Sequence, residues 1–593
     1  MTRKQRSDIP VQETWNLDDL FSSHEAWEAE IIAIDRDLST VTQYQGKLAE
    51  GPAVLKACLD AQEELQKRLL RASAYAGFRL ATDSMEASHQ ADSTRIAALG
   101  AGVSAGINFI SSEVIALPEG TVEQWLEQDA ELATYRHALE NVLAYRPYTL
   151  SPESEAVVAG LGEVLESPFR VYSVSKGADM TFAPVTDEEG HEHAVYDGGA
   201  QSSSDPVLRR KAYLSYTEGL KPYRNTYATT FATEVKKNIA LAKLRGYESA
   251  EQMLLFPHKV SLKVYHNVLD IIGKELAPHM RRYQKLRQRL MGLDNMLYCD
   301  LAAPLGEEAE VSYEQAQEWT LGALEVLGEE YHALMRRAFD ERWIDRADNV
   351  GKRSGAFCNT VYGVHSYVFM TWNNRMRPVF TLAHELGHAG HLSLAGKSQR
   401  LSHTRPPLSF IEAPSTMNEL LLAEYLLKRS DDPKVRRSVI NGLMGTYNHN
   451  YVNHLLEGEL QRRIYARAEA GEPITERVLS ATKGEILGAF WGDTLEIDDG
   501  ARLLWMRQPH YYMGLYPYTY ALGLTISTAA AQAIREQGQP AVDRWLQVLK
   551  AGGTLSTVEL AQVAGVDITS PEAIRKAVAY VGSLVDELER SYE

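Results

Sequence analysis

Cysteine is scarce in this chain of 593 residues, which has only Cys58, Cys299 and Cys358, far apart and without a C-x-x-C pair. Such a set does not form the framework of a disulfide-rich secreted domain and is typical of a reducing compartment. Long apolar runs are also lacking. The most apolar tracts, 96–110 and 520–534, are interrupted by polar residues or glycine and fall short of the roughly 18 apolar residues of a spanning helix.

No apolar run follows the basic residues of the first 15 positions, so the N-terminus does not resemble a signal peptide. Basic residues are fewer than acidic ones, since the chain has 61 Lys and Arg and 79 Asp and Glu and thus a formal net charge of −18. A nucleic acid or an anionic membrane needs a basic face on its partner. We therefore expect a cytoplasmic protein that binds neither nucleic acid nor membrane.

What the chain does contain is a long series of helical patterns. Apolar residues recur at three- and four-residue spacings over 54–80, 84–99 and most later segments, which predicts a mainly α protein. Two places differ. Tracts 171–174, 180–182 and 194–196 have strand composition around a turn signal at 186–190, which indicates a small β-hairpin. Tract 366–372 is also typical of a strand.

The most informative stretch is 381–393, TLAHELGHAGHLS. It contains H-E-x-x-H, with His384, Glu385 and His388. Residues four apart lie on the same face of a helix, so both imidazoles can bind one metal ion. Glu385 can then take a proton from a water that the metal activates, which is the chemistry of amide hydrolysis. A chance pattern on a surface helix is the alternative interpretation.

Two histidines leave a catalytic zinc site one protein ligand short. Glu412 and Glu419, seven positions apart in an apolar helical segment, lie on one helical face. Carboxylates on a mostly buried helix need a metal, a charge partner or hydrogen bonds. We assign Glu412 as the third ligand and Glu419 as the residue that orients a ligand histidine. The alternative is that both are solvated helix charges.

These residues resemble the family of zinc peptidases that includes thimet oligopeptidase and oligoendopeptidase F, which shows H-E-x-G-H-x-x-H and then F-x-E-x-x-S-x-x-x-E. His391 falls on the first pattern, and Glu412, Ser415 and Glu419 fall on the second. The tracts TWNLDDLF, LRRKAYLSY and IALAKLRGYESA are similar to the oligoendopeptidase F branch, so the resemblance covers most of the chain. It implies a mainly α, multi-helix zincin-type metallopeptidase with a small β element lining a deep central cleft, and one Zn²⁺ per chain.

The tract 508–523 holds His510 and five tyrosines. Such tyrosines are most often packing residues, but O–H and N–H donors can also stabilise the oxyanion of amide hydrolysis. The resemblance implies one histidine, His510, followed by two tyrosines that act on the substrate carbonyl. Tyr520 is our choice for the downstream tyrosine and Tyr512 for the upstream one. Tyr516 and Tyr518 stay open, because the spacing is shorter than in the thimet branch.

We predict a zinc-dependent endopeptidase that hydrolyses internal bonds of short oligopeptides, with Glu385 as general base. Its expected regions are an N-terminal helical region 1–115, a helical and β-hairpin region 116–204 that completes the N-terminal domain, and a catalytic domain 205–593. Gly355 and Ala356 are expected in the cleft wall. Strand 366–372 either offers an edge to the substrate backbone or is a core strand.

Two alternatives remain. A metallocarboxypeptidase-type exopeptidase would need a cation for the terminal carboxylate, such as Arg353 or Arg375. A catalytically inactive helical peptide-binding protein would need no general base, so Glu385 disfavours it. The sequence gives no indication of the oligomeric state.

Overall fold

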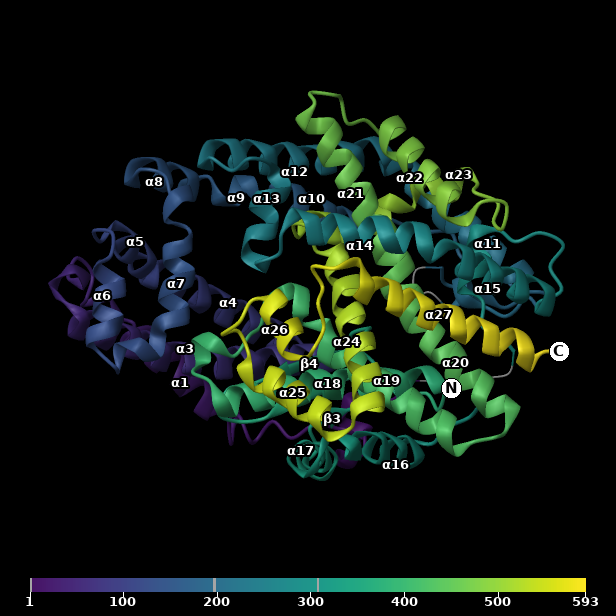
Figure 1. Ribbon diagram of the computed structural model, residues 1–593, viewed down its shortest axis with the longest axis horizontal. Coiled ribbons are helices and arrows are strands. Elements are labelled where there is room, and N and C mark those ends of the chain that lie inside the picture. The colour runs from purple at the N-terminus through teal and green to yellow at the C-terminus, as the bar shows by residue number, and fades with distance from the viewer. Residues whose placement is uncertain (1–2, 196–198, 307–308) are drawn as a thin grey trace.

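The computed structural model describes residues 3–195, 199–306 and 309–593 and is mainly helical, as predicted (Figure 1). The first ten helices are coloured purple to blue in Figure 1. The first seven lie together at one end of the molecule, and the tenth packs on a helix of the larger body. The ten are α1 His24–Asp37, α2 Ser39–Thr42, α3 Pro52–Thr82, α4 Ala87–Ile107, α5 Phe109–Ala116, α6 Thr121–Gln128, α7 Arg136–Ala144, α8 Pro152–Gly160, α9 Gly162–Leu165 and α10 Ser167–Val174.

Helices α1 to α7 enclose a core of their own, built around the long helix α3. Trp27 is fully buried, and its indole N–H donates to the carbonyl oxygen of Ala72 at 2.9 Å. The same core takes in Tyr367 and Phe369 from a strand far along the chain. The N-terminal helices are thereby packed against the part of the molecule that carries the predicted zinc site.

The remaining helices form the larger body, in which α18 and α19 lie near the centre (Figure 1). They are α11 Pro206–Leu220, α12 Arg224–Arg245, α13 Ala250–Leu255, α14 Leu262–Glu275, α15 Ala277–Leu290, α16 Tyr313–Leu324, α17 Glu329–Asp340, α18 Met376–Ser398, α19 Glu412–Arg429, α20 Pro433–Tyr447, α21 His454–Glu469, α22 Glu476–Trp491, α23 Asp499–Leu503, α24 Pro517–Gln537, α25 Gln539–Ala551, α26 Thr557–Val563 and α27 Pro571–Ser591.

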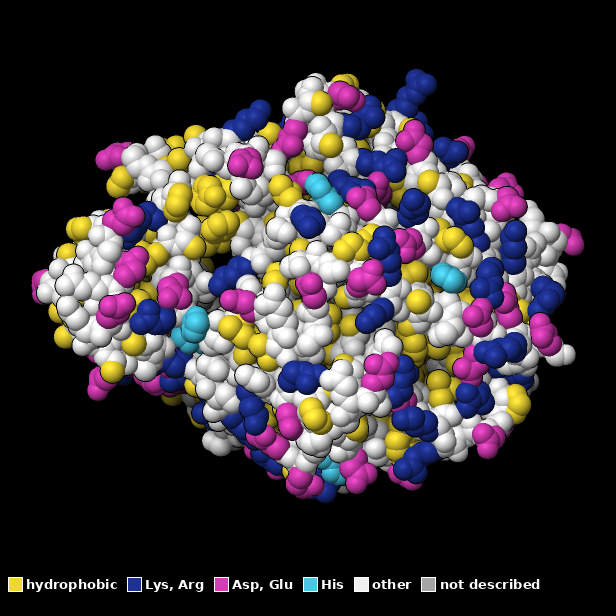
Figure 2. Space-filling model, in the orientation of Figure 1, with side chains coloured by type: hydrophobic (Ala, Val, Ile, Leu, Met, Phe, Trp, Pro, Cys, Tyr) yellow, Lys and Arg dark blue, Asp and Glu magenta, His cyan; other side chains and the backbone are white. Residues whose placement is uncertain are grey.

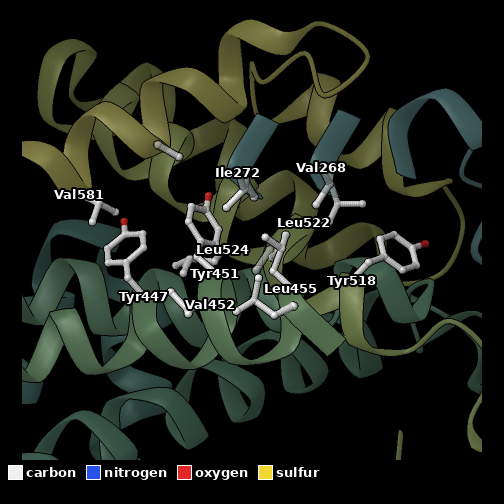
Figure 3. Packing of buried hydrophobic residues seen from close by; sticks show 14 of the residues in the cluster. Val268, Ile272, Tyr447, Tyr451, Val452, Leu455, Tyr518, Leu522, Leu524 and Val581 are labelled. Atoms are coloured by element: carbon white, nitrogen blue, oxygen red, sulfur yellow. The ribbon is translucent and has the colours of Figure 1, made fainter. Parts of the chain in front are cut away.

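A second core joins these helices. Figure 3 shows part of it, where Tyr451 and Leu455 lie close to Leu522 and Leu524 of α24 and to Ile272 of α14. Apolar side chains packed this closely leave little freedom to shift without losing contacts. The segment from α20 to α21 is therefore held firmly against α24, which becomes important at the site.

Strands are few and short. β3 Ile344–Asp345, β4 Phe357–Thr360 and β5 Ser366–Phe369 form one sheet in the order β3-β5-β4, with β4 antiparallel and β3 parallel to β5. The predicted strand at 366–372 is thus confirmed for its first four residues. All four are buried between two neighbours, so this strand is the core strand of our two alternatives, and β4 provides an edge of the sheet.

The predicted β-hairpin is correct only at its tip. β1 Val185–Thr186 pairs with β2 Glu192–His193 around the expected turn, whereas Tyr196 of the predicted third tract lies outside the described residues. The prediction of a strand at 171–174 is wrong, because these residues end helix α10. Pro168 starts that helix, and Tyr172 is buried in it with its hydroxyl donating to the carbonyl oxygen of Arg507 at 2.8 Å, so tertiary packing outweighs the β propensity of the tract.

One stretch of the described chain, Ala87–Ala116 across α4 and α5, is long and apolar enough to cross a membrane by length and composition alone. The apolar tract at 96–110, which by itself falls short of a membrane span, forms the central part of this stretch. Here α4 lies along α3 and buries Ile96 and Val103 in the core of the N-terminal helices.

The surface mixes acidic and basic side chains on the face drawn in Figure 2. That face is hollowed between the N-terminal helices and the larger body (Figure 2). A cavity of about 810 Å³ lies between these two parts and is lined by Tyr145 from one side and by Phe256, Lys259 and Arg405 from the other.

Candidate active site

Helix α18 carries the H-E-x-x-H residues through the middle of the molecule. It begins directly after Arg375, whose backbone is extended, and Pro378 occupies its first turn, where a proline costs no hydrogen bond. Most of the apolar and small residues of α18 are buried. The rings of His384 and His388 lie one turn apart, with centroids separated by 5.0 Å.

Helix α19 approaches α18 very closely. A Cβ atom at Gly387 would lie 2.4 Å from the carbonyl oxygen of Pro414 and 2.6 Å from the Cα of Ser415. Helix α24 approaches α19 in a similar way, since a Cβ at Gly523 would lie 3.0 Å from the Cβ of Glu412. The two glycines therefore allow Glu412 to reach the histidines of α18.

The three predicted ligands come together. The Nε2 atoms of His384 and His388 lie 3.3 and 3.5 Å from Oε2 of Glu412, and one ligand atom from each residue lies within 4.8 Å of the others. Ser415 donates its hydroxyl hydrogen to the same carboxylate oxygen at 3.0 Å. Two imidazoles and one carboxylate are a donor set that catalytic zinc takes in proteins, so the residues fit the metal that the sequence implies.

Glu419 lies where it was predicted, next to His384. Its Oε1 is 2.7 Å from Nδ1 of His384, and its Oε2 accepts a hydrogen bond from Thr446. A carboxylate on Nδ1 leaves Nε2 free to face a metal. Burial disfavours charge on His384, but hydrogen bonds to Glu412 and Glu419 outweigh it and raise the pKa of the imidazole well above its ordinary value.

Glu385 points into a cavity of about 630 Å³ that is also lined by Gly355, Ala356 and His384. Its side chain is 6% exposed and has no hydrogen-bond partner among the described residues. Burial raises the pKa of this carboxyl above its usual value. A carboxyl that holds a proton more readily is suited to accept one and return it near neutral pH.

The tyrosine tract divides into distinct environments. Tyr516 and Tyr520 lie beside His510, with ring centroids 4.8 and 5.8 Å from its imidazole. Nδ1 of His510 is buried and has no hydrogen-bond partner within the part of the chain that the structure describes. Burial raises the pKa of Tyr516 and Tyr520, and the negative charge of Glu412 adds to the increase.

The other tyrosines of the tract lie away from this group. The hydroxyl of Tyr512 lies 3.1 Å from Oγ1 of Thr230, and its ring packs on Tyr172. Tyr518 is fully buried with its hydroxyl 2.9 Å from Nδ1 of His258. The structure therefore brings together His510, Tyr516 and Tyr520 and does not bring Tyr512 to them.

Two arginines of the alternative hypothesis lie in different places. Arg375 lines the cavity of Glu385 together with Arg377. Arg353 instead lines a groove of about 700 Å³ between α3 and β4. Burial raises the pKa of the Cys358 thiol in β4 and so disfavours the thiolate that a nucleophile would need.

Sequence reasoning missed a second pair of histidines. His449 lines the cavity of His384 and Glu385, and His454 stacks on Tyr520 with a centroid distance of 4.0 Å. They are five positions apart, a spacing that does not place two residues on one face of an α-helix. No sequence pattern therefore pointed to them.

The chain matches the model of peptidase family M3 over residues 200–580 and a model described as Oligopeptidase F over residues 113–182. Oligopeptidase PepF of Bacillus subtilis is 33% identical over 98% of this chain and 88% of that protein. The crystal structure of oligoendopeptidase-F from Enterococcus faecium has a TM-score of 0.75 at 26% identity and covers 96% of this chain and 99% of that one. A solved structure from Chlamydophila abortus has a TM-score of 0.86 at 27% identity over the whole of both chains.

Proposed function

Because the chain belongs to peptidase family M3 and is a metalloendopeptidase of that family, we propose that it hydrolyses internal bonds of short oligopeptides with one Zn²⁺ per chain. The observation that carries the proposal is that ligand atoms of His384, His388 and Glu412 lie within 4.8 Å of one another. Of these residues, His384 lines the same cavity as Glu385. The presence of a buried carboxylate next to the donor set disfavours an inactive binding protein, which would need no base.

His384, His388 and Glu412 would hold the zinc, which as a Lewis acid would polarise the scissile carbonyl and lower the pKa of a water. Glu385 takes the proton of the attacking water and delivers it to the nitrogen of the leaving amine. Glu419 keeps the proton of His384 on Nδ1 and thereby orients its ring.

Stabilisation of the oxyanion is assigned to His510 and Tyr520, which donate N–H and O–H hydrogen bonds toward the carbonyl oxygen of the substrate. For the second tyrosine, the position of its ring beside His510 favours Tyr516 over our earlier choice, Tyr512. Replacement of Tyr520 by Phe removes only the hydroxyl and should lower kcat more than it raises KM.

The test is a set of internally quenched peptides of increasing length, with products mapped by mass spectrometry before and after chelation and zinc restoration. Zinc-dependent internal cuts that fade as the peptides lengthen would support the proposal. Cuts at the C-terminus alone would identify a carboxypeptidase, for which Arg375 and Arg377 in the cavity offer cations. Binding without turnover would refute the proposed activity.

A further inference from the structure

The segment that joins α20 to α21 is a π-helical turn, Asn448–Asn453. In an α-helix, residues five apart point in directions about 140° from each other. The wider π turn instead brings Nε2 of His449 to 3.2 Å from Nε2 of His454. Such turns are rare and are found frequently at functional sites.

The opposite side of this turn is fixed in the core. The hydroxyls of Tyr447 and Tyr451 lie 2.7 Å from the hydroxyls of Thr528 and Thr525, both on α24. Figure 3 shows Tyr447 and Tyr451 on the side of the segment that packs on the core. Helix α24 also carries Tyr520. The same helix therefore positions Tyr520 and fixes the orientation of the turn that contains His449.

A chain of hydrogen bonds leads to His449 from outside the turn. The side-chain nitrogen of Gln508 lies 3.5 Å from Nδ1 of His454. An amide NH₂ group can only donate, so Nδ1 of His454 accepts, and the proton of this neutral ring is on Nε2. That N–H donates to Nε2 of His449, whose own proton must then be on Nδ1.

Both rings stay neutral at neutral pH. Burial lowers the pKa of His449 to about 4 and that of His454 to about 2. His449 is nevertheless exposed to the cavity that it lines, and among the described residues its Nδ1 has no hydrogen-bond partner. A neutral imidazole with an unused N–H therefore faces the space beside His384 and Glu385.

We propose that His449 is a substrate-binding residue whose Nδ1–H donates to a backbone carbonyl oxygen of the bound peptide, and that His454 and Gln508 are positioning residues that fix its tautomer. The inference rests on the proposed function, because the contact requires a peptide in this cavity. It adds a donor to the site beside Tyr520, whose ring centroid lies 5.6 Å from that of His449.

Three substitutions of His449 test the contact in the full-length zinc enzyme. The amide nitrogen of Asn lies near the place of Nδ1, whereas that of Gln lies near the place of Nε2. We expect H449A and H449Q to lower kcat/KM by about 10- to 100-fold, and H449N to recover at least 10-fold relative to H449A. His89→Ala, which removes a histidine from α4, serves as the matched control, and zinc content should stay stoichiometric in all variants.

The tautomer of His449 is determined by NMR, independently of peptide turnover. In ¹⁵N-histidine spectra of the wild type, the signals that disappear in H449N should be those of an Nδ1–H tautomer. Gln508→Glu supplies only acceptors and should convert His454 to the Nδ1–H form and His449 to the Nε2–H form. His454 is buried, so it is not substituted.

The outcomes separate the two proposals. A wild type that cuts peptides, with H449A within two-fold of it or with H449N as low as H449A, overturns the role of His449 and leaves the peptidase intact. An Nε2–H tautomer of His449 in the wild type also overturns it. A wild type that cuts no peptide overturns the proposed function and the substrate contact together.

Discussion

Gly387 of α18 faces the carbonyl oxygen of Pro414 of α19 at a distance that leaves no room for a side chain, since a Cβ there would lie 2.4 Å from that oxygen. The neighbouring atoms are backbone and cannot rotate away. This close approach brings the carboxylate of Glu412 to the imidazoles of His384 and His388. The packing of α18 on α19 and the geometry of the three proposed metal ligands thus both depend on the absence of a side chain at Gly387.

Gly387→Ala should therefore destabilise the protein and loosen the proposed zinc site. We expect a loss of about 3 kcal/mol in the free energy of unfolding, at the upper end of the usual cost of overpacking, and weaker zinc binding. The control is Gly396→Ala on the same helix, where the nearest atom lies 3.8 Å away and alanine should be tolerated. Equal denaturant midpoints for the two variants would contradict the prediction.

Glu385→Gln should abolish catalysis while leaving the fold and the metal in place. Gln fills the same space but cannot take a proton, so kcat should fall by about 10³-fold, within the range measured for general base residues. Zinc content is measured by atomic absorption and the fold by circular dichroism. Turnover within a few-fold of the wild type would exclude Glu385 as the base.

Glu419→Gln should weaken zinc binding without removing a ligand. The substitution takes away the negative charge that accepts from Nδ1 of His384, and changes of this kind cost about 10- to 100-fold in metal affinity. Affinity is measured by competition with a chromophoric chelator. Glu424→Gln, on the same helix but paired with Lys428, should leave affinity unchanged; an equal loss there would mean that the effect is not specific.

Removal of zinc should lower the melting temperature as well as the activity. A ligand that binds only the folded state stabilises it by roughly 2.7 kcal/mol at a hundred times its Kd. Chelation followed by zinc restoration is monitored by differential scanning calorimetry. Glu412→Ala should melt at the temperature of the chelated wild type and gain little from added zinc, and a full recovery of that variant would argue against Glu412 as a ligand.

Acid should destabilise the protein in part through His258. Burial lowers the pKa of this imidazole to about 4, below its unfolded value of about 6.5. The unfolded chain therefore binds the proton first, and the stability present above pH 6.5 is lost as the pH falls toward 4. Between pH 7.5 and 5 the expected loss from this one group is roughly 2 kcal/mol.

The variant His258→Asn isolates that contribution. Asn does not titrate and can still accept from the hydroxyl of Tyr518 in place of Nδ1. Chemical denaturation at the two pH values should show a smaller loss in the variant than in the wild type by about that amount. Parallel losses in both proteins would show that His258 does not contribute.

The sequence by itself determined the helical class and the two histidines of the proposed metal site, because both depend on spacing within a continuous helix. The approach of Glu412 and Glu419 to His384 was predictable only because the acidic residues share a face of one buried helix. Near the site, predictions from local sequence patterns were wrong where contacts between distant segments determine the local structure. β5 is central because β4 covers its edge, and 171–174 is helical because Tyr172 packs on partners hundreds of residues away.

The tertiary structure alone decided which polar groups join the cavity. Tyr512 and Tyr516 have the same chemistry, and only the path of the chain into α24 sets Tyr516 beside His510. His449 enters the cavity because a π-helical turn breaks the α-helical period that sequence reasoning assumes. That turn is held by contacts with α24, about 75 residues further along the chain, and packing between such distant segments leaves no periodic trace in the sequence.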